Sequence, residues 1–64
     1  MVKVNGMELD IAGMTAAQYL AQTKYDPKRI ALELNGEIVP KSQYDKTVLK
    51  DGDALEIVSF VGGG

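Results

Sequence analysis

The sequence contains no cysteine and no histidine among its 64 residues. Without cysteine, the chain can form no disulfide, no thiolate metal site and no cysteine nucleophile. Without histidine, it lacks the side chain most often used as a general base or metal ligand. These absences argue against an enzyme that works through its own side chains. If the chain takes part in chemistry, we expect it to act as a substrate or carrier.

Excess basic charge and long hydrophobic runs are missing as well. Seven Lys and Arg residues stand against nine Asp and Glu residues, which gives a net charge of −2. Nucleic-acid-binding domains are basic, so we expect no nucleic-acid partner. No apolar run is long enough to cross a bilayer, and the N-terminal segment lacks the pattern of a signal peptide. We therefore expect a cytoplasmic protein without a membrane partner.

The composition is that of an ordinary globular domain, with 45% apolar and 25% charged residues. At this length we expect a single domain that is monomeric on its own. Such a small domain buries only about 60% of its unfolded surface, so its stability is marginal.

Alternation of apolar and polar residues predicts strands over 1–5 and 7–11, with Val2, Val4, Met7, Leu9 and Ile11 on buried faces. The Asn5-Gly6 pair between them is typical of a two-residue hairpin turn, because both positions need positive φ. A second hairpin is predicted by the same signal at Asn35-Gly36. It joins a strand over 30–34 to a short return strand over 37–39. Pro40 cannot donate a ladder hydrogen bond, which places this return strand at a sheet edge.

Between the two hairpins, the spacing predicts an amphipathic helix from about Ala16 to Lys24. Thr15 is a good N-cap, and Gln18 three residues later completes a capping box. The three tyrosines, Tyr19, Tyr25 and Tyr44, are expected to be half-buried core residues and not catalytic phenols. The adjacent Lys28 and Arg29 can contact a phosphate or an acidic partner, but a solvated loop is the favoured interpretation.

The segment after the second hairpin is predicted to make a helical turn over 41–46, to dock on the core over 47–49 and to turn tightly over 50–53. Gly52 supplies the backbone conformation that this turn requires. Asp51 and Asp53 resemble a cation site only superficially, because a calcium loop needs more oxygen ligands at defined spacing. The turn accounts for both aspartates.

The last predicted strand runs from Ala54 to Val61. If Leu55 and Ile57 face the core, Val58 and Phe60 point outward near the end of the chain. Contiguous exposed apolar residues often mark a docking surface. The alternative, that a loop covers the end of the strand, stays open for Val58.

The sequence ends in Gly62-Gly63-Gly64. Because glycine has no Cβ, we expect a thin, flexible tail over 62–64 that follows a folded domain over 1–61. Such a tail can enter a narrow active site of another protein and present the α-carboxylate of Gly64. A linker without function is the alternative that the glycines alone allow.

The elements follow the order strand, strand, helix, strand, short strand, strand. One helix with a single apolar stripe can cover one face of a mixed sheet of four to five strands, which predicts a two-layer α+β domain.

Several motifs resemble those of the ubiquitin-like sulfur carrier proteins of thiamin thiazole biosynthesis, the ThiS family. They are Asn5-Gly6, the helix start at Thr15, the run 34–40, the turn 50–53 and the terminal Phe60-Val61-Gly62-Gly63-Gly64. The resemblance covers the whole chain. It implies a β-grasp fold, in which the first and last strands are central neighbours and the main helix packs on one face.

The resemblance also implies a function that needs no bound cofactor or metal. An E1-like adenylating enzyme (ThiF-like) joins the Gly64 carboxylate to AMP, using ATP. A cysteine desulfurase or another sulfur donor then supplies a persulfide, which yields a thiocarboxylate for thiazole synthase (ThiG-like). Gly63 lies beside Gly64 in the enzyme channel, and we expect Val58, Phe60, Val61 and Gly62 to form the surface that the partners bind.

Three other functions remain open at this stage. A carrier for another pathway, such as the small subunit of molybdopterin synthase, ends in the same glycines. A β-grasp binding module without covalent chemistry tolerates residues added after Gly64. A protein-conjugating modifier leaves isopeptide adducts on lysines.

Overall fold

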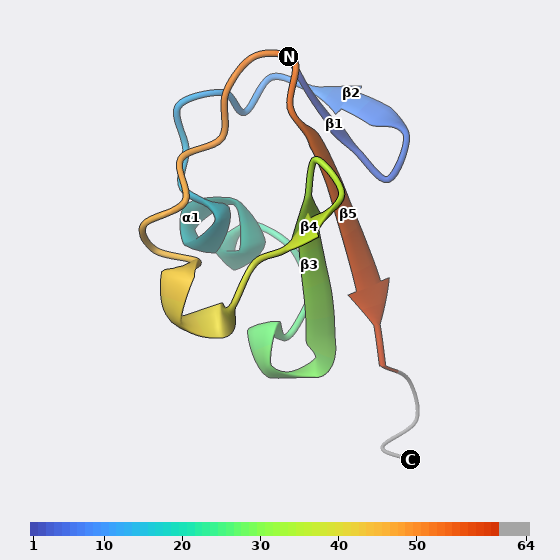
Figure 1. Cartoon of the computed structure of the whole chain (residues 1–64), viewed down its shortest axis with the longest axis vertical. Helices are drawn as coiled ribbons and strands as arrows, with labels where there is room; N and C mark the ends of the chain where they lie inside the picture. Colours follow the sequence, from blue (N-terminus) through green and yellow to red (C-terminus); the bar gives the residue numbers. More distant parts are fainter. Residues whose placement is uncertain (61–64) are drawn as a thin grey trace.

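The computed structural model describes residues 1–60, which form one sheet with a helix packed against it (Figure 1). The short 3₁₀ turns at 27–29 and 41–43 lie between the main elements. The helix is α1 (Ala16–Ala21), and the strands are β1 (Val2–Val4), β2 (Met7–Leu9), β3 (Ile30–Leu34), β4 (Glu37–Ile38) and β5 (Ala54–Ser59). This arrangement confirms the predicted α+β class.

The five strands are hydrogen-bonded in the order β2-β1-β5-β3-β4. The central strand β5 runs parallel to β1 and antiparallel to β3. The first and last strands are therefore neighbours at the middle of the sheet, as the family resemblance implied. The short return strand β4 lies at an edge of the sheet, as Pro40 predicted.

Both Asn-Gly pairs form the tight hairpin turns that the sequence predicts. Asn5 and Gly6 have φ values of 48° and 86°, and Asn35 and Gly36 have values of 52° and 87°. Positive φ at both central positions is the geometry that matches the twist of the flanking strands.

The helix begins as predicted and ends earlier than predicted. The Thr15 hydroxyl accepts from the Gln18 backbone N–H, and the Gln18 side chain accepts from the Thr15 N–H, which completes the capping box. Helix α1 ends at Ala21 and not at Lys24. The N–H groups of Gln22 and Thr23 donate to the carbonyls of Tyr19 and Leu20, three residues back. Such bonds tighten and terminate a last turn.

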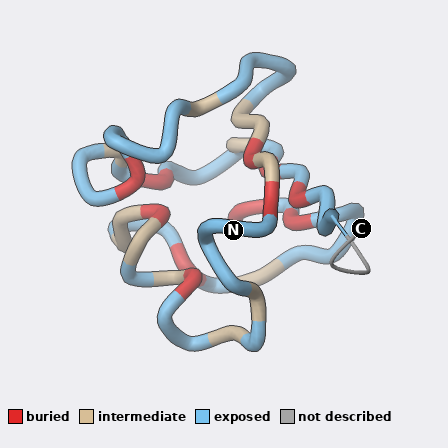
Figure 2. Tube along the Cα trace, turned by 90° about the horizontal axis from the view of Figure 1, so that it is seen from below, coloured by how far each residue is buried: buried red, intermediate tan, exposed pale blue. Residues whose placement is uncertain are grey.

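The core lies between α1 and the sheet, and Figure 2 shows the buried stretches on these elements in red and the exposed hairpin turns in pale blue. Its fully buried large side chains are Leu20, Ile30, Leu32, Leu49, Leu55 and Val2. Tyr19 and Tyr25 pack partly buried against this core, as predicted, while Tyr44 is buried more deeply, at 5% exposure. The segment 47–49 docks through Leu49, whereas Val48 stays exposed.

The prediction that Met7 lies on a buried face is wrong. Met7 is 65% exposed, although Leu9 is partly buried and Ile11 is buried. The reason is the position of β2 at the outer edge of the sheet, where it pairs only with β1. The tip of this hairpin extends beyond the area that α1 covers (Figure 1).

The predicted length of the last strand is also corrected. Strand β5 ends at Ser59, whereas the alternation extended it to Val61. The Phe60 N–H still donates to the Arg29 carbonyl at 2.7 Å, but β3 begins only at Ile30, so the ladder stops there. Val61, and with it the predicted tail over 62–64, lies outside the described residues.

Candidate functional site

The site proposed from the sequence lies at the end of β5, and the side chain of Asn5 holds this strand. Its amide nitrogen donates to the Ile57 carbonyl at 3.2 Å, and its amide oxygen accepts from the Ile57 N–H at 2.7 Å. Because β1 ends at Val4, the asparagine amide takes the place of a further strand residue. The first hairpin thereby fixes β5 beyond the point where backbone pairing with β1 stops.

The second hairpin holds the start of the same strand. The Asn35 amide oxygen accepts from the Ala54 N–H at 2.9 Å, and its amide nitrogen donates to Asp53 at 3.0 Å. The Asn35 backbone N–H adds a bond to the Ala54 carbonyl at 2.8 Å. Two asparagines with positive φ therefore make both the turns and the contacts that position β5.

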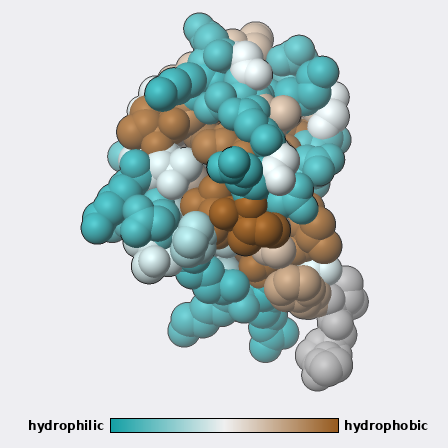
Figure 3. Space-filling view, in the orientation of Figure 1, coloured by the Kyte–Doolittle hydropathy of each residue, from teal (hydrophilic) through white to brown (hydrophobic). Residues whose placement is uncertain are grey.

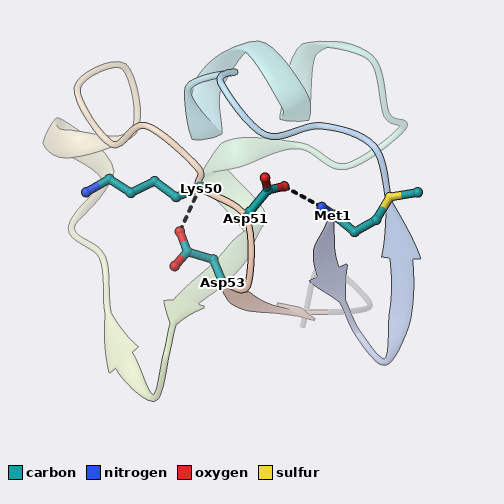
Figure 4. Close-up of polar contacts among 4 residues, drawn as sticks. All are labelled: Met1, Lys50, Asp51 and Asp53. Atoms are coloured by element: carbon teal, nitrogen blue, oxygen red, sulfur yellow. Dashed lines mark hydrogen bonds and ion pairs between the residues drawn. The ribbon is translucent and has the colours of Figure 1, made fainter.

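The turn before β5 is closed by the two aspartates, as Figure 4 shows. Asp53 accepts from the Lys50 backbone N–H at 2.9 Å, and Asp51 pairs with the α-amino group of Met1. The Gly52 N–H, at φ 89°, donates to the Met1 carbonyl at 2.9 Å. Among residues 1–60 no group of three acidic, histidine or cysteine side chains can hold a metal ion, and the turn accounts for both carboxylates.

Among residues 1–60, three groups have shifted pKa values, each for an identifiable reason. The hydrogen bond to Asp51 raises the pKa of the Met1 α-amino group above its ordinary 8.0, although loss of solvent opposes this. Burial raises the pKa values of Tyr19 and Tyr44 above 10.0. A neutral, packed phenol fits the interpretation that these tyrosines are core residues.

The loop that carries the adjacent basic residues is organised by Asp26. Its carboxylate accepts from the Lys28 backbone N–H at 2.9 Å and lies 3.7 Å from the Arg29 Nε. Lys28 and Arg29 are both exposed. This geometry supports the interpretation of a solvated loop.

The two outward-facing residues predicted for β5 are exposed. Val58 is 52% exposed and Phe60 is 57% exposed, and the alternative in which a loop covers Val58 is wrong for residues 1–60. Apolar surface gathers near the end of β5 (Figure 3). The other proposed site residues, Val61, Gly62, Gly63 and Gly64, lie outside the described residues.

The rest of this face is assembled by strand pairing, which local sequence patterns do not specify. Glu33 of β3 lies directly opposite Glu56 of β5, and Ile38 of β4 lies opposite Glu33 on the other side. Ile38 is 64% exposed. Glu33 and Glu56 each alternate with buried residues of their strands, so both fall on the outward face. Only the pairing register shows that they meet.

A shallow groove of about 580 Å³ lies on the helix side, between α1 and the segment 41–45. Leu20, Tyr25, Tyr44 and Lys41 contribute to its lining. The Lys41 ammonium donates to the Ile30 carbonyl at 3.3 Å and so is used within the fold. Neither Val58 nor Phe60 lines this groove. No helix within residues 1–60 has the length and apolar character needed to cross a membrane.

A mixed sheet in the order β2-β1-β5-β3-β4, with parallel β1 and β5 at its centre and one helix across it, is a β-grasp domain. The described fold thus belongs to the ubiquitin-like class that the sequence suggested. Similarity to known proteins identifies the family within this class.

The model of the ThiS family matches residues 2–64. The sulfur carrier protein ThiS of Bacillus subtilis is 36% identical over 66 residues, a match that covers 100% of both chains. The crystal structure of the thiamine biosynthesis protein ThiS from Geobacter metallireducens superimposes with a TM-score of 0.77 at 36% identity, covering 98% of this chain and 97% of that one. The chain belongs to the ThiS family of sulfur carrier proteins.

A further relative is larger. The thiazole synthase of Paramagnetospirillum magneticum is 47% identical over 62 residues, which are 95% of this chain. This chain spans only 19% of the length of that protein.

Proposed function

We propose that this chain carries sulfur on the α-carboxyl group of Gly64 and delivers it for thiazole formation in thiamin biosynthesis. The observation that carries the proposal is membership of the ThiS family over residues 2–64, which includes the terminal glycines. In this account the chain is a co-substrate of cytoplasmic enzymes and binds no cofactor of its own. Its fold positions the strand that leads to the reactive end.

The first step is activation of the carboxylate. An α-carboxyl group has a pKa of about 3.3–3.7 and is ionised at neutral pH. One of its oxygens attacks the α-phosphorus of ATP, the bond to pyrophosphate breaks, and an acyl-adenylate forms. The chain has no histidine or cysteine to assist this step, so an E1-like adenylating enzyme supplies the alignment and the charge stabilisation.

The second step exchanges oxygen for sulfur. A persulfide sulfur from a cysteine desulfurase or another donor attacks the acyl carbon, and the bond to AMP breaks. A thiol then reduces the resulting acyl disulfide. This leaves the thiocarboxylate on Gly64 and a disulfide on the donor side.

Thiazole synthase is the proposed acceptor of this sulfur. Support comes from the P. magneticum relative, which bears that name and contains a segment similar to this chain. Val58 and Phe60, together with Val61 and Gly62, are the proposed contact residues for the adenylating enzyme and the synthase. The first two present exposed apolar surface, and such patches commonly mark interaction sites.

An adenylation assay tests the proposal. The purified chain is incubated with the adenylating enzyme of the same organism and ATP, and release of pyrophosphate is followed. We expect activity with the chain ending at Gly64 and none with a chain extended by one alanine or lacking Gly63 and Gly64. Equal activity of the extended chain would contradict a role for the Gly64 carboxylate.

A further inference from the structure

Two carboxylates face each other on the outer side of the sheet, away from α1. Glu33 and Glu56 are directly opposite partners in the antiparallel ladder of β3 and β5. Such partners have Cβ atoms about 4.5–5.5 Å apart, and like charges in this position destabilise a sheet. Glu56 is exposed and Glu33 is partly buried, so both carboxylates are open to an approaching molecule.

No cation among residues 1–60 lies within ion-pair distance of either carboxylate. Within residues 1–60 the ion pairs shorter than 4.0 Å join Met1 to Asp51 and Arg29 to Asp26. Lys3 lies beside Ala54, two residues before Glu56 on β5, and it is the direct partner of Glu8 in the first hairpin. The sheet therefore holds two like charges together without a compensating contact of its own.

Two exposed apolar side chains flank the glutamate pair. Ile38 is the direct partner of Glu33 on β4, and Val58 follows Glu56 on the same face of β5. They are 64% and 52% exposed. Protein interfaces combine apolar area with arginine more often than with lysine. The planar guanidinium of arginine has five donors in a fixed fork and can bond to two carboxylates at once. The ammonium of lysine is a compact charge and matches two carboxylates less well.

We propose that this surface, defined by Glu33, Glu56, Ile38 and Val58 and called here the acidic face, binds thiazole synthase. The matching surface of the synthase is apolar and places one arginine between the two carboxylates. The inference rests on the proposed function, in which the chain must meet a synthase, and it specifies the chemistry of that contact. The paired carboxylates and the exposed apolar area of the carrier support this chemistry, and the relative named thiazole synthase, which contains a similar segment, supports the choice of partner.

The test measures two properties of Glu33→Gln, Glu56→Gln and the double variant. Affinity for the purified thiazole synthase of the same organism is measured by calorimetry with the unloaded carrier. We expect each single change to weaken binding about 3–10-fold and the double change to weaken it further. The melting temperature of the free carrier should rise by about 1–4 °C, because the repulsion is removed.

Glu37→Gln is the matched control, since it makes the same change of charge on β4. Glu37 pairs with Leu34, whose side chain packs against the core, so it lies off the acidic face. We expect no change of affinity for this variant. The proposal is overturned if the wild-type chain does not bind the synthase, if the double variant binds within about twofold of wild type, or if Glu37→Gln weakens binding equally.

Loading of the same variants with sulfur separates this inference from the proposed function. If Gly64 accepts sulfur and the acidic-face variants bind like wild type, the docking inference alone fails. If Gly64 of the wild-type chain never accepts sulfur, the proposed function fails, whatever the binding data show.

Discussion

At the scale of single residues, the polar side chains near β5 have distinct roles. Asp53 and Asn35 organise the turn and the first residue of the strand through hydrogen bonds. Asp51 instead holds the Met1 α-amino group, which joins the start of β1 to the turn before β5. This last contact depends on pH, because the amine is charged only below its pKa.

Asp51→Asn tests that contact. The pKa of the Met1 α-amino group is raised in the folded chain, so its stabilising contribution is complete below the ordinary value of 8.0 and is lost as pH rises through the folded value. Between about pH 7 and pH 9.5 we expect the melting temperature of wild type to fall more than that of the variant. Tyr19 and Tyr44 have pKa values above 10.0 and stay protonated in this window. Parallel curves for the two proteins would exclude the contact.

Phe60→Asp tests the exposed aromatic residue. Since Phe60 is 57% exposed, the free energy of unfolding should change by no more than about 0.5 kcal/mol. Binding to the adenylating enzyme and to thiazole synthase should weaken about tenfold or more, while Phe60→Leu should retain most of it. Melting and binding are measured on the same sample. Unchanged binding would remove Phe60 from the proposed contact surface.

At the scale of elements, the two hairpins serve the strand that lies between them. Each Asn-Gly turn joins its own pair of strands, and each asparagine side chain also bonds to β5. The turn residue and the positioning residue are thus the same residue. Asparagine suits both tasks, because it tolerates positive φ and its amide carries a donor and an acceptor.

Asn5→Gly separates these two tasks, since glycine adopts the same φ of 48° without an amide side chain. Loss of the two bonds to Ile57 should lower the free energy of unfolding by about 1–2 kcal/mol. The Ile57 amide should exchange its hydrogen faster. Asn5→Asp keeps the acceptor, so its Ile57 amide should stay better protected than in the glycine variant. Equal protection of that amide in wild type and Asn5→Gly would refute the role.

Local signals explain why most elements could be predicted from the sequence. The capping box at Thr15, the Asn-Gly turns and the alternation over 30–34 each act within a few residues. The predictions were wrong where residues distant in sequence determine the burial of a side chain or the end of a strand. Met7 is exposed because no element within residues 1–60 covers the tip of the edge hairpin, and β5 stops where β3 begins.

The candidate site was predictable only in part for the same reason. Parity along the last strand placed Val58 and Phe60 outward, once Leu55 and Ile57 were assigned to the core. The meeting of Glu33 with Glu56 depends on the register between two strands more than 20 residues apart in sequence, which no local pattern specifies.

At the scale of the whole molecule, stability and chemistry are assigned to different parts of the chain. Within residues 1–60 the buried core is built from residues between Val2 and Ile57, while the proposed reactive group belongs to Gly64. We therefore expect deletion of residues 62–64 to abolish function and to change the free energy of unfolding by no more than about 0.5 kcal/mol. Urea denaturation of both chains measures this, and a larger loss would show that the tail contributes to the fold.

The most direct test of the central claim is the mass of the carrier after reaction. The chain is incubated with the adenylating enzyme, ATP, a persulfide donor and a thiol, and intact-mass and C-terminal fragment analysis follow. We expect replacement of one oxygen by sulfur, located on Gly64, in the wild-type chain and not in a chain extended by one residue. Sulfur on the extended chain, or an unchanged Gly64 in an active reaction mixture, would contradict it.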